Sequence, residues 1–435
     1  MTRLTPGSPL AIALRFDESA ADLPVGRTVM AGSKAGGRAM LEWHADRLGD
    51  VRRVSPLLYP PEPGLIEARG PAFDGLHGFL ADSLPDGWGA LLMRRRVERL
   101  GTRWDRLDPV DRLALVGKQG RGALVFTPAT TPPAEAETLD LSALAAQSRA
   151  ILLGEEAQLV DTLATLGGAS GGARPKVHVG FGSDGMIRVD EGETAPGHES
   201  WPLWESWPLW ESWIVKFPAL TDPVDIGPVE MAYATMAQAA GIAMAPCRLL
   251  PARHGPGHFA TRRFDRPAPG RRLHMVSLAG AVEAPPHLPA LDYDGFLRAT
   301  LAITRDVRDV EAAFRRMVFN VLACNRDDHT GQHAYLMDES GTWRLAPAYD
   351  LTFSAGPGGE HYLAVAGEGR APTRAHVLHL AQTHGIAPAR AAEVIGEVAA
   401  AVADWPAHAQ AAGVTASRAE IAARLGQIAR DFAGS

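Results

Sequence analysis

The sequence predicts an α+β protein of two or three structural units, and three observations lead to this prediction. The chain has 435 residues, of which 46% are hydrophobic, so it can bury more apolar surface than one core usually holds. Short apolar runs bounded by turn residues recur in the first two thirds of the chain and predict strands. After residue 300, apolar residues recur at helical spacing and predict a helical C-terminal part.

The first unit is predicted from mixed sequence over residues 8–130. The apolar run 10–14 reads as a strand, and a helix from about Gly87 ends at Gly101, where glycine can adopt the left-handed conformation. Residues 127–137 are rich in Pro, Ala, Thr and Glu, which offer little to pack, and they predict a linker with a domain boundary near it. A six-residue duplication at 201–212 is expected to lengthen a surface loop, and an aromatic docking patch is the less favoured alternative.

The later elements follow from local pattern. We expect strands at 177–179, 213–217 and 261–266, and a helix near 228–233. The apolar face of residues 310–322 predicts a core helix, and residues 335–345 read as a hairpin around an Asp-Glu-Ser-Gly turn. Alanine-rich sequence from about 387 to 433 predicts closing helices.

Charge and cysteine content restrict the function classes. The net charge of −7 excludes a basic excess that would drive nonspecific binding to nucleic acid, so we expect any DNA binding to go through a partner. Cys247 and Cys324 form no C-x-x-C pair, which favours buried thiols in a reducing cytoplasm over zinc or a disulfide. Without a signal-peptide pattern or a membrane-length apolar stretch, a soluble intracellular protein is expected.

The strongest chemical signal is a polar loop that follows the predicted core helix. Asp327 and Gln332 are five residues apart, and Asp350 follows after the hairpin. Phosphoryl-transfer enzymes place a base and their magnesium ligands in this order. Asp327 would accept the proton of a substrate hydroxyl, Gln332 would offer an amide oxygen to Mg²⁺, and Asp350 would bridge metal and phosphate. His329 is expected to hold the loop more than to transfer protons.

A phosphoryl-transfer enzyme also needs a cover for the phosphates and a cation. The glycine-rich run 167–176 could bring backbone amides close to phosphate oxygens, although it lacks a Walker ending. Ser170 within it is either a turn hydroxyl or a modifiable switch. Lys216 is isolated in an apolar strand. It is either a surface lysine at the rim of an edge strand or is paired with phosphate or with a carboxylate, which Glu230 could supply.

A competing interpretation of the polar loop is a transition-metal site for hydrolysis. It would use His329 and His333 together with Asp327 and Asp328. We rank it lower because a loop that follows a helix does not align side chains four residues apart.

Seven motifs together resemble the HipA family, the serine/threonine kinase toxins of type II toxin–antitoxin modules, over nearly the whole chain. They lie at residues 85–88, 117–124, 171–176, 213–217, 263–266, 325–329 and 346–351. The resemblance implies a kinase-like two-lobed domain with a smaller N-terminal α/β subdomain. The implied boundaries are 1–135 for the N-terminal subdomain, 136–265 for the N-lobe and 266–435 for the mostly helical C-lobe.

The resemblance also implies site residues, cofactors and partners. ATP and Mg²⁺ would bind between the lobes, with Asp327 as catalytic aspartate and Asp350 as metal ligand. A HipB-like helix-turn-helix antitoxin would be the partner through which DNA is bound, and known family targets include aminoacyl-tRNA synthetases. The nucleotide contacts would come from the glycine loop, the lysines and the adenine hinge, namely Gly171, Gly172, Ala173, Lys176, Lys216, Arg263 and Phe264.

Two departures from the family pattern affect these expectations. Gln332 stands where the family usually has asparagine, and its extra methylene could weaken magnesium binding, since this ion tolerates little departure from octahedral distances. Ala169 stands where the family carries an autophosphorylated serine, with Ser170 displaced by one position. Two alternatives therefore stay open: a catalytically weakened nucleotide-binding module that acts through an antitoxin, and a small-molecule kinase of the aminoglycoside type.

Overall fold

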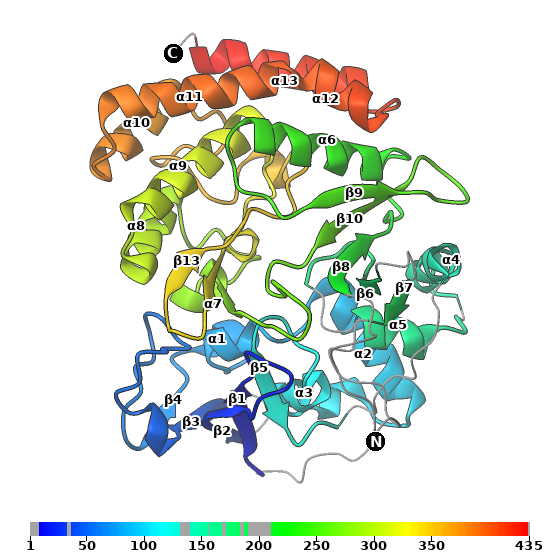
Figure 1. The fold of residues 1–435 in the computed structure, drawn as a ribbon, viewed down its shortest axis with the longest axis vertical. Coiled ribbons are helices and arrows are strands. Elements are labelled where there is room, and N and C mark those ends of the chain that lie inside the picture. Colours follow the sequence, from blue (N-terminus) through cyan, green and yellow to red (C-terminus); the bar gives the residue numbers. More distant parts are fainter. Residues whose placement is uncertain are drawn as a thin grey trace.

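The computed structural model describes residues 8–32, 36–130, 140–155, 157–167, 171–182, 187–189 and 210–433. Ser170, most of the predicted linker and most of the duplicated segment lie outside these residues. The structure contains an N-terminal sheet, a second sheet and a helical part. The C-terminal helices lie at the end of the molecule opposite the N-terminal sheet (Figure 1). Within the described ranges, no helix is long and apolar enough to cross a membrane.

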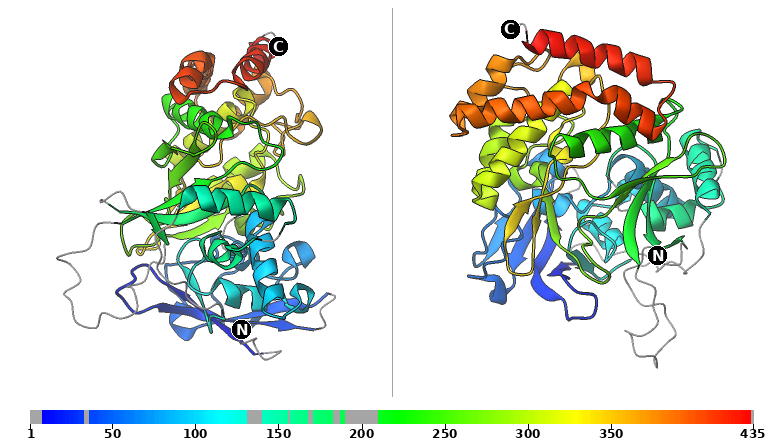
Figure 2. Two further views of the ribbon diagram at one scale, coloured as in Figure 1. Left: turned by 90° about the vertical axis from the view of Figure 1, so that its right-hand side faces the viewer. Right: turned by 45° about the horizontal axis from the view of Figure 1, so that its top comes forward.

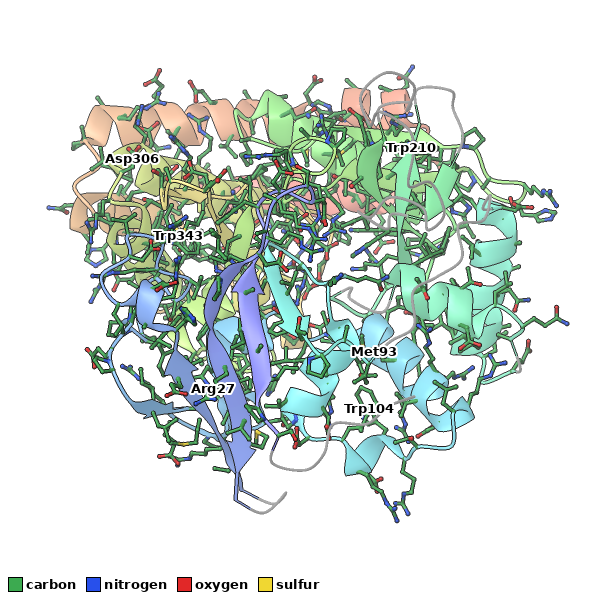
Figure 3. All side chains as sticks on the ribbon, turned by 60° about the horizontal axis from the view of Figure 1, so that its bottom comes forward. Arg27, Met93, Trp104, Trp210, Asp306 and Trp343 are labelled. Atoms are coloured by element: carbon green, nitrogen blue, oxygen red, sulfur yellow. The ribbon has the colours of Figure 1, made fainter. Side chains whose placement is uncertain are left out.

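The N-terminal subdomain (residues 8–130) is built on an antiparallel sheet in the order β4-β3-β2-β1-β5. The predicted apolar run is its strand β1, and the predicted helix at 87–100 is α2. In Figure 3, Met93 of α2 and Trp104 lie among the helices beside this sheet, and Arg27 lies on the sheet itself. The elements are β1 (Leu10–Leu14), β2 (Leu23–Ala31), β3 (Arg38–Trp43), β4 (Leu65–Glu67), α1 (Gly78–Ala81), α2 (Gly87–Arg99), α3 (Pro109–Val116) and β5 (Leu124–Thr127).

The N-lobe (described residues from 140 to 262) carries a second sheet, in the order β7-β6-β8-β10-β9. Neighbouring strands of this sheet run antiparallel, and β6 pairs with β8 so that Lys176 stands opposite Lys216. The elements are α4 (Leu141–Leu152), α5 (Val160–Gly167), β6 (Lys176–Phe181), β7 (Ile187–Val189), β8 (Glu211–Lys216), α6 (Ile226–Ala239), β9 (Cys247–Leu250) and β10 (His258–Arg262).

The C-lobe (residues 266–433) is mainly helical, as predicted, with a small sheet in the order β11-β12-β13. The predicted hairpin is β12–β13, and the alanine-rich end forms α11 to α13, which lie across one end of the molecule (Figure 2). The elements are β11 (His274–Ser277), α7 (Leu278–Val282), α8 (Tyr293–Thr304), α9 (Val307–Leu322), β12 (Ala334–Met337), β13 (Trp343–Leu345), α10 (Arg374–Thr383), α11 (Pro388–Ala403), α12 (Trp405–Ala412) and α13 (Arg418–Ala433).

Two large hydrophobic cores hold these parts together. One runs from the N-terminal sheet into the C-lobe helices, and the other lies between the N-lobe sheet and α4 and α5. Helix α2 belongs to the N-terminal subdomain in sequence, yet its Trp88 and Leu92 are buried in the N-lobe core. The α+β class is confirmed, and the N-terminal subdomain is part of the packing of both lobes. The cysteine prediction holds in part, since Cys324 is a buried free thiol and Cys247 is free but only partly buried.

Candidate phosphoryl-transfer site

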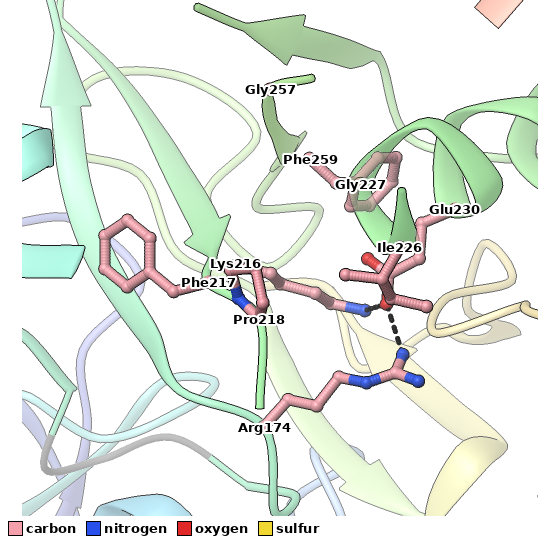
Figure 4. A pocket seen from close by; sticks show the side chains of 9 residues that line it. All are labelled: Arg174, Lys216, Phe217, Pro218, Ile226, Gly227, Glu230, Gly257 and Phe259. Atoms are coloured by element: carbon pink, nitrogen blue, oxygen red, sulfur yellow. Dashed lines mark hydrogen bonds and ion pairs between the residues drawn. The ribbon is translucent and has the colours of Figure 1, made fainter. Parts of the chain in front are cut away.

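A buried lysine–glutamate pair lies beside a small pocket of the N-lobe. Lys216 ends β8, and its Nζ donates to Glu230 Oε1 of α6 at 3.1 Å (Figure 4). The two side chains are only 8% and 2% exposed, so each would be costly to bury alone. Lys216 Nζ also lies 5.4 Å from the centre of the Phe259 ring. Glu230 is therefore the partner that the isolated lysine required, as the sequence predicted.

Asp350 brings the C-lobe to the same lysine. Its Oδ1 accepts a hydrogen bond from Lys216 Nζ, and its Oδ2 accepts one from Gln332 Nε2 at 3.3 Å. Burial opposes ionisation of Asp350, but Lys216 and Lys176 outweigh it and hold the pKa of this carboxyl well below its usual range. Asp350 has a left-handed φ of 56°, an uncommon conformation outside glycine that concentrates at functional sites.

The described end of the glycine loop, residues 171–175, approaches these charges. Lys176 Nζ donates to Gly171 O at 2.6 Å. A Cβ added to Gly172, whose φ is +84°, would lie 2.9 Å from Lys176 Nζ and 4.0 Å from Asp350 Oδ2. Glycine thus lets the loop backbone come close to the metal-ligand candidate, which is the geometry expected of a phosphate cover. Ala173 is exposed next to this turn.

The pKa values of the two lysines of the site shift in opposite directions. Burial lowers the pKa of Lys216, but Asp350 and Glu230 outweigh it and the pKa is raised. For Lys176, 7% exposed, burial dominates over the attraction of Asp350 and the pKa is lowered. Its Nζ donates to a backbone carbonyl, that of Gly171. A buried ammonium in this position is stabilised by a further anion, and a phosphate group would supply one.

Two neighbouring aspartates of the polar loop differ in burial and in hydrogen bonding. Helix α9 ends at Leu322, and Cys324 turns the chain with a φ of 50°. Asp328 is fully buried and accepts hydrogen bonds from Tyr293 Oη at 2.7 Å and the Tyr362 amide at 2.9 Å, and its Oδ2 lies 2.7 Å from His361 Nδ1. The side chain of Asp327 is 48% exposed. Asp328 therefore anchors the loop, and Asp327 is the one free to meet a substrate.

Asp327 lies within electrostatic reach of the charges already described. Crowding by protein atoms raises its pKa above the usual value, His329 and Arg174 oppose this rise, and Asp350 adds to it. His329 Nε2 lies 3.9 Å from Asp327 Oδ1, and its Nδ1 accepts the Gly331 amide at 3.1 Å at the start of the turn Thr330–Gln332. His329 thus holds the loop beside the aspartate.

The competing transition-metal interpretation is wrong for this loop. His333 is 1% exposed and packs against Phe296 with ring centres 4.1 Å apart, and Asp328 is occupied by the partners named above. Across the described ranges, no three His, Cys, Asp or Glu side chains gather where they could hold a metal ion. The loop residues point in different directions, as expected when no continuous helix aligns them.

The two hinge residues behave differently from one another. The Arg263 guanidinium is buried and donates to Asp265 at 2.8 and 3.1 Å, so its side chain is used within the protein and the predicted adenine contact falls to the backbone. Phe264 lies with its ring centre 5.5 Å from that of Tyr349, whose hydroxyl donates to Gly331 O at 2.6 Å. The hinge, the polar loop and Asp350 are thereby joined.

Arg174 is a site residue to which the sequence alone assigned no role. It donates to Glu230 Oε1 at 2.6 Å and to Asp222 Oδ1 at 3.1 Å, and it lines the pocket with Lys216. Its place two residues before Lys176 was the available signal, because a second cation in the glycine-rich run suggests an anion site. Asp222 had no such signal.

The residues present fit a magnesium ion that arrives with a nucleotide. Mg²⁺ is usually bound through one or two carboxylates plus substrate phosphates. The lowered pKa of Asp350 keeps its carboxyl ionised. The Gln332 side chain is longer than that of the asparagine usual in the family, and its amide still lies within hydrogen-bond distance of Asp350. To serve as a ligand, Gln332 would present its oxygen, whereas its nitrogen faces Asp350 here.

Two family models match this chain, and solved structures resemble its fold to different degrees. Residues 168–405 match the HipA-like C-terminal domain, and residues 20–127 match the HipA N-terminal domain. HipA from the Shewanella oneidensis MR-1 complex of HipA, HipB and operator DNA is 16% identical, with a TM-score of 0.68 over 98% of this chain and 97% of that one. The Helicobacter pylori proinflammatory kinase CtkA is 12% identical, with a TM-score of 0.37 over 55% of this chain and 93% of that one. No curated protein matched the sequence.

Proposed function

Because this chain belongs to the HipA family, we propose that it is an ATP- and magnesium-dependent serine/threonine protein kinase that acts as the toxin of a toxin–antitoxin module. One observation supports this proposal more than any other. Lys216, Lys176, Asp350 and Gln332 come from distant parts of the sequence and gather at one place, with Asp327 within electrostatic reach. That is the set of charges that phosphoryl transfer needs.

Each group has a role in the proposed reaction. The amides of the glycine loop, Lys176 and Lys216 would bind the nucleotide phosphates, and Phe264 of the hinge would contact adenine. Bound magnesium, held by Asp350 and Gln332, would supply positive charge to the phosphate oxygens.

The exposed carboxylate of Asp327 would act as the base in the transfer step. The oxygen of a substrate hydroxyl forms a bond to the γ-phosphorus, and the bond from this phosphorus to the bridging oxygen breaks, which releases ADP. The hydroxyl proton passes to Asp327. The raised pKa of Asp327 makes it a better proton acceptor than an ordinary aspartate.

The biological role is proposed by family analogy. A HipB-like antitoxin would restrain the kinase and carry it to operator DNA, since the net charge of −7 argues against direct binding to DNA. The solved Shewanella complex contains HipA, HipB and operator DNA, and it supports such a partner. The substrate would be a translation factor such as an aminoacyl-tRNA synthetase in the cytoplasm, and its phosphorylation would halt translation and favour persistence.

The test is phosphorylation by the purified chain with labelled ATP and magnesium. We expect label on the chain itself or on a lysate protein, and a loss of about 100-fold or more in Asp327→Ala, because a positioned base contributes that much. Asp105→Ala, which removes an exposed carboxylate paired with Arg103, is the matched control and should keep full activity. Equal labelling by Asp327→Ala would refute the assignment of the base, and label only on added small molecules would favour the aminoglycoside-type alternative.

A further inference from the structure

The segment 86–88 of the N-terminal subdomain contacts the glycine loop directly. The Gly172 amide donates to Asp86 Oδ1, and Gly172 O accepts the Trp88 amide at 3.0 Å. Both backbone groups of Gly172 are therefore bound by residues more than 80 positions earlier in the chain. The Trp88 indole also donates to Lys176 O at 3.1 Å, on the far side of the same turn.

Two backbone segments pack closely at this contact, which explains why Gly87 and Gly171 lack room for a side chain. A Cβ added to Gly87, whose φ is +43°, would lie 2.6 Å from Gly172 O and 2.9 Å from the Ala173 Cα. Such distances require the loop to move. A Cβ added to Gly171 would lie 2.9 Å from Arg121 Nη1 and 3.3 Å from Asp86 Oδ1, and Arg121 itself donates to Asp82 O at 2.6 Å.

The side chain of Asp86 does not cap the helix that it precedes. It occupies the N-cap position of α2, where an aspartate normally accepts amides of the first turn, but it makes no side-chain cap hydrogen bond. Asp108, at the N-cap of α3, does accept the Asp111 amide at 2.8 Å. The carboxylate of Asp86 is instead used on the glycine loop, so the contact concerns the site and not the stability of α2.

We propose that Asp86 is a positioning residue that fixes the glycine loop over Lys176 and Asp350, so that the N-terminal subdomain sets the affinity for nucleotide. This inference rests on the proposed function for its nucleotide readout. Asp86 itself touches neither metal nor phosphate in the proposed reaction. Its effect passes through Gly172, at which an added Cβ would lie 2.9 Å from Lys176 Nζ and 4.0 Å from Asp350 Oδ2.

The first test needs no nucleotide. Hydrogen exchange of the Gly172 amide in the free chain should be at least threefold faster in Asp86→Ala, because its acceptor is gone. Asp86→Asn keeps an oxygen acceptor and should stay close to the parent. Asp108→Ala, the matched control, should lower the melting temperature through loss of a cap and leave Gly172 exchange unchanged. Unchanged exchange in Asp86→Ala would overturn the inference.

The second test is calorimetric titration with magnesium–ATP analogue. Asp86→Ala should bind about three- to tenfold more weakly, since one exposed charge-assisted hydrogen bond orders the loop, and Asp86→Asn should recover most of this loss. Gly87→Ala should bind more weakly still, because it displaces the loop. If the parent binds no nucleotide, the proposed function fails and the exchange experiment alone decides the loop contact. If the parent binds and Asp86→Ala binds equally well, the positioning role is wrong.

Discussion

Replacing Asp350 by asparagine separates charge from shape at the centre of the site. Asparagine has nearly the same size, and it tolerates the left-handed conformation that residue 350 adopts at a φ of 56°. Asp350→Asn therefore removes the negative charge without adding backbone strain. Asp350→Ala would remove the charge and also place alanine in an unfavourable backbone conformation, at an additional cost of about 1 kcal/mol.

The size of the stability effect follows from the partners of Asp350. Removing one member of a buried ion pair typically costs about 3–5 kcal/mol. Here Lys216 keeps Glu230 at 3.1 Å, and the Asp350 side chain is 24% exposed, so part of that cost is avoided. We expect the free energy of unfolding to fall by about 1–3 kcal/mol at pH 7, which lowers the melting temperature of a chain of 435 residues by about 1–3 °C.

Two measurements check this prediction. Scanning calorimetry of parent, Asp350→Asn and Asp350→Ala should give that order of melting temperatures. Titration with ATP should show a magnesium-dependent gain in affinity for the parent and none for either variant, because the ion loses its carboxylate ligand.

The pH dependence follows from the lowered pKa of Asp350 in the folded state. A carboxyl with a lowered folded pKa stabilises the protein above its unfolded value of about 3.8, and this contribution is lost as the pH falls further. The gap between parent and Asp350→Asn should be full at pH 7 and should narrow below about pH 4. An asparagine variant as stable as the parent at pH 7, with unchanged magnesium dependence, would refute the reasoning.

Three further predictions concern the polar loop. Since burial raises the pKa of Asp327, the acid limb of the rate profile should lie above 3.8, with activity falling as the pH drops through it; a limb at or below 3.8 in kcat against pH would contradict this. Asp328→Ala leaves the Tyr293 hydroxyl, the His361 ring and the Tyr362 amide without their shared partner and should cost about 3–5 kcal/mol in urea unfolding. Asp327→Ala should cost under about 1 kcal/mol, and equal costs would remove the distinction between the two aspartates. Gln332→Asn should change the phosphorylation rate by less than about threefold, because glutamine already reaches Asp350; a rise of tenfold or more would favour a catalytically weakened protein.

Local pattern in the sequence determined the elements and the order of the chemical groups. The apolar spacing of residues 310–322 was sufficient to predict α9, and the turn residues at 338–341 were sufficient to predict the β12–β13 hairpin. Both follow from interactions between near neighbours. The need of Lys216 for an anionic partner was also readable, because an ammonium in an apolar strand is costly wherever it is buried.

Tertiary structure alone decided which of two adjacent aspartates is free and which is buried. The order of the chemical groups favoured Asp327 as the base, but the packing of Tyr293 and His361 that occupies Asp328 could not be read from the sequence. The same holds for the contact between Asp86 and Gly172, since hydrogen bonds between residues far apart leave no period in the sequence. Sequence spacing determines what a chain segment can form, and long-range packing determines which of its polar groups remain available for chemistry.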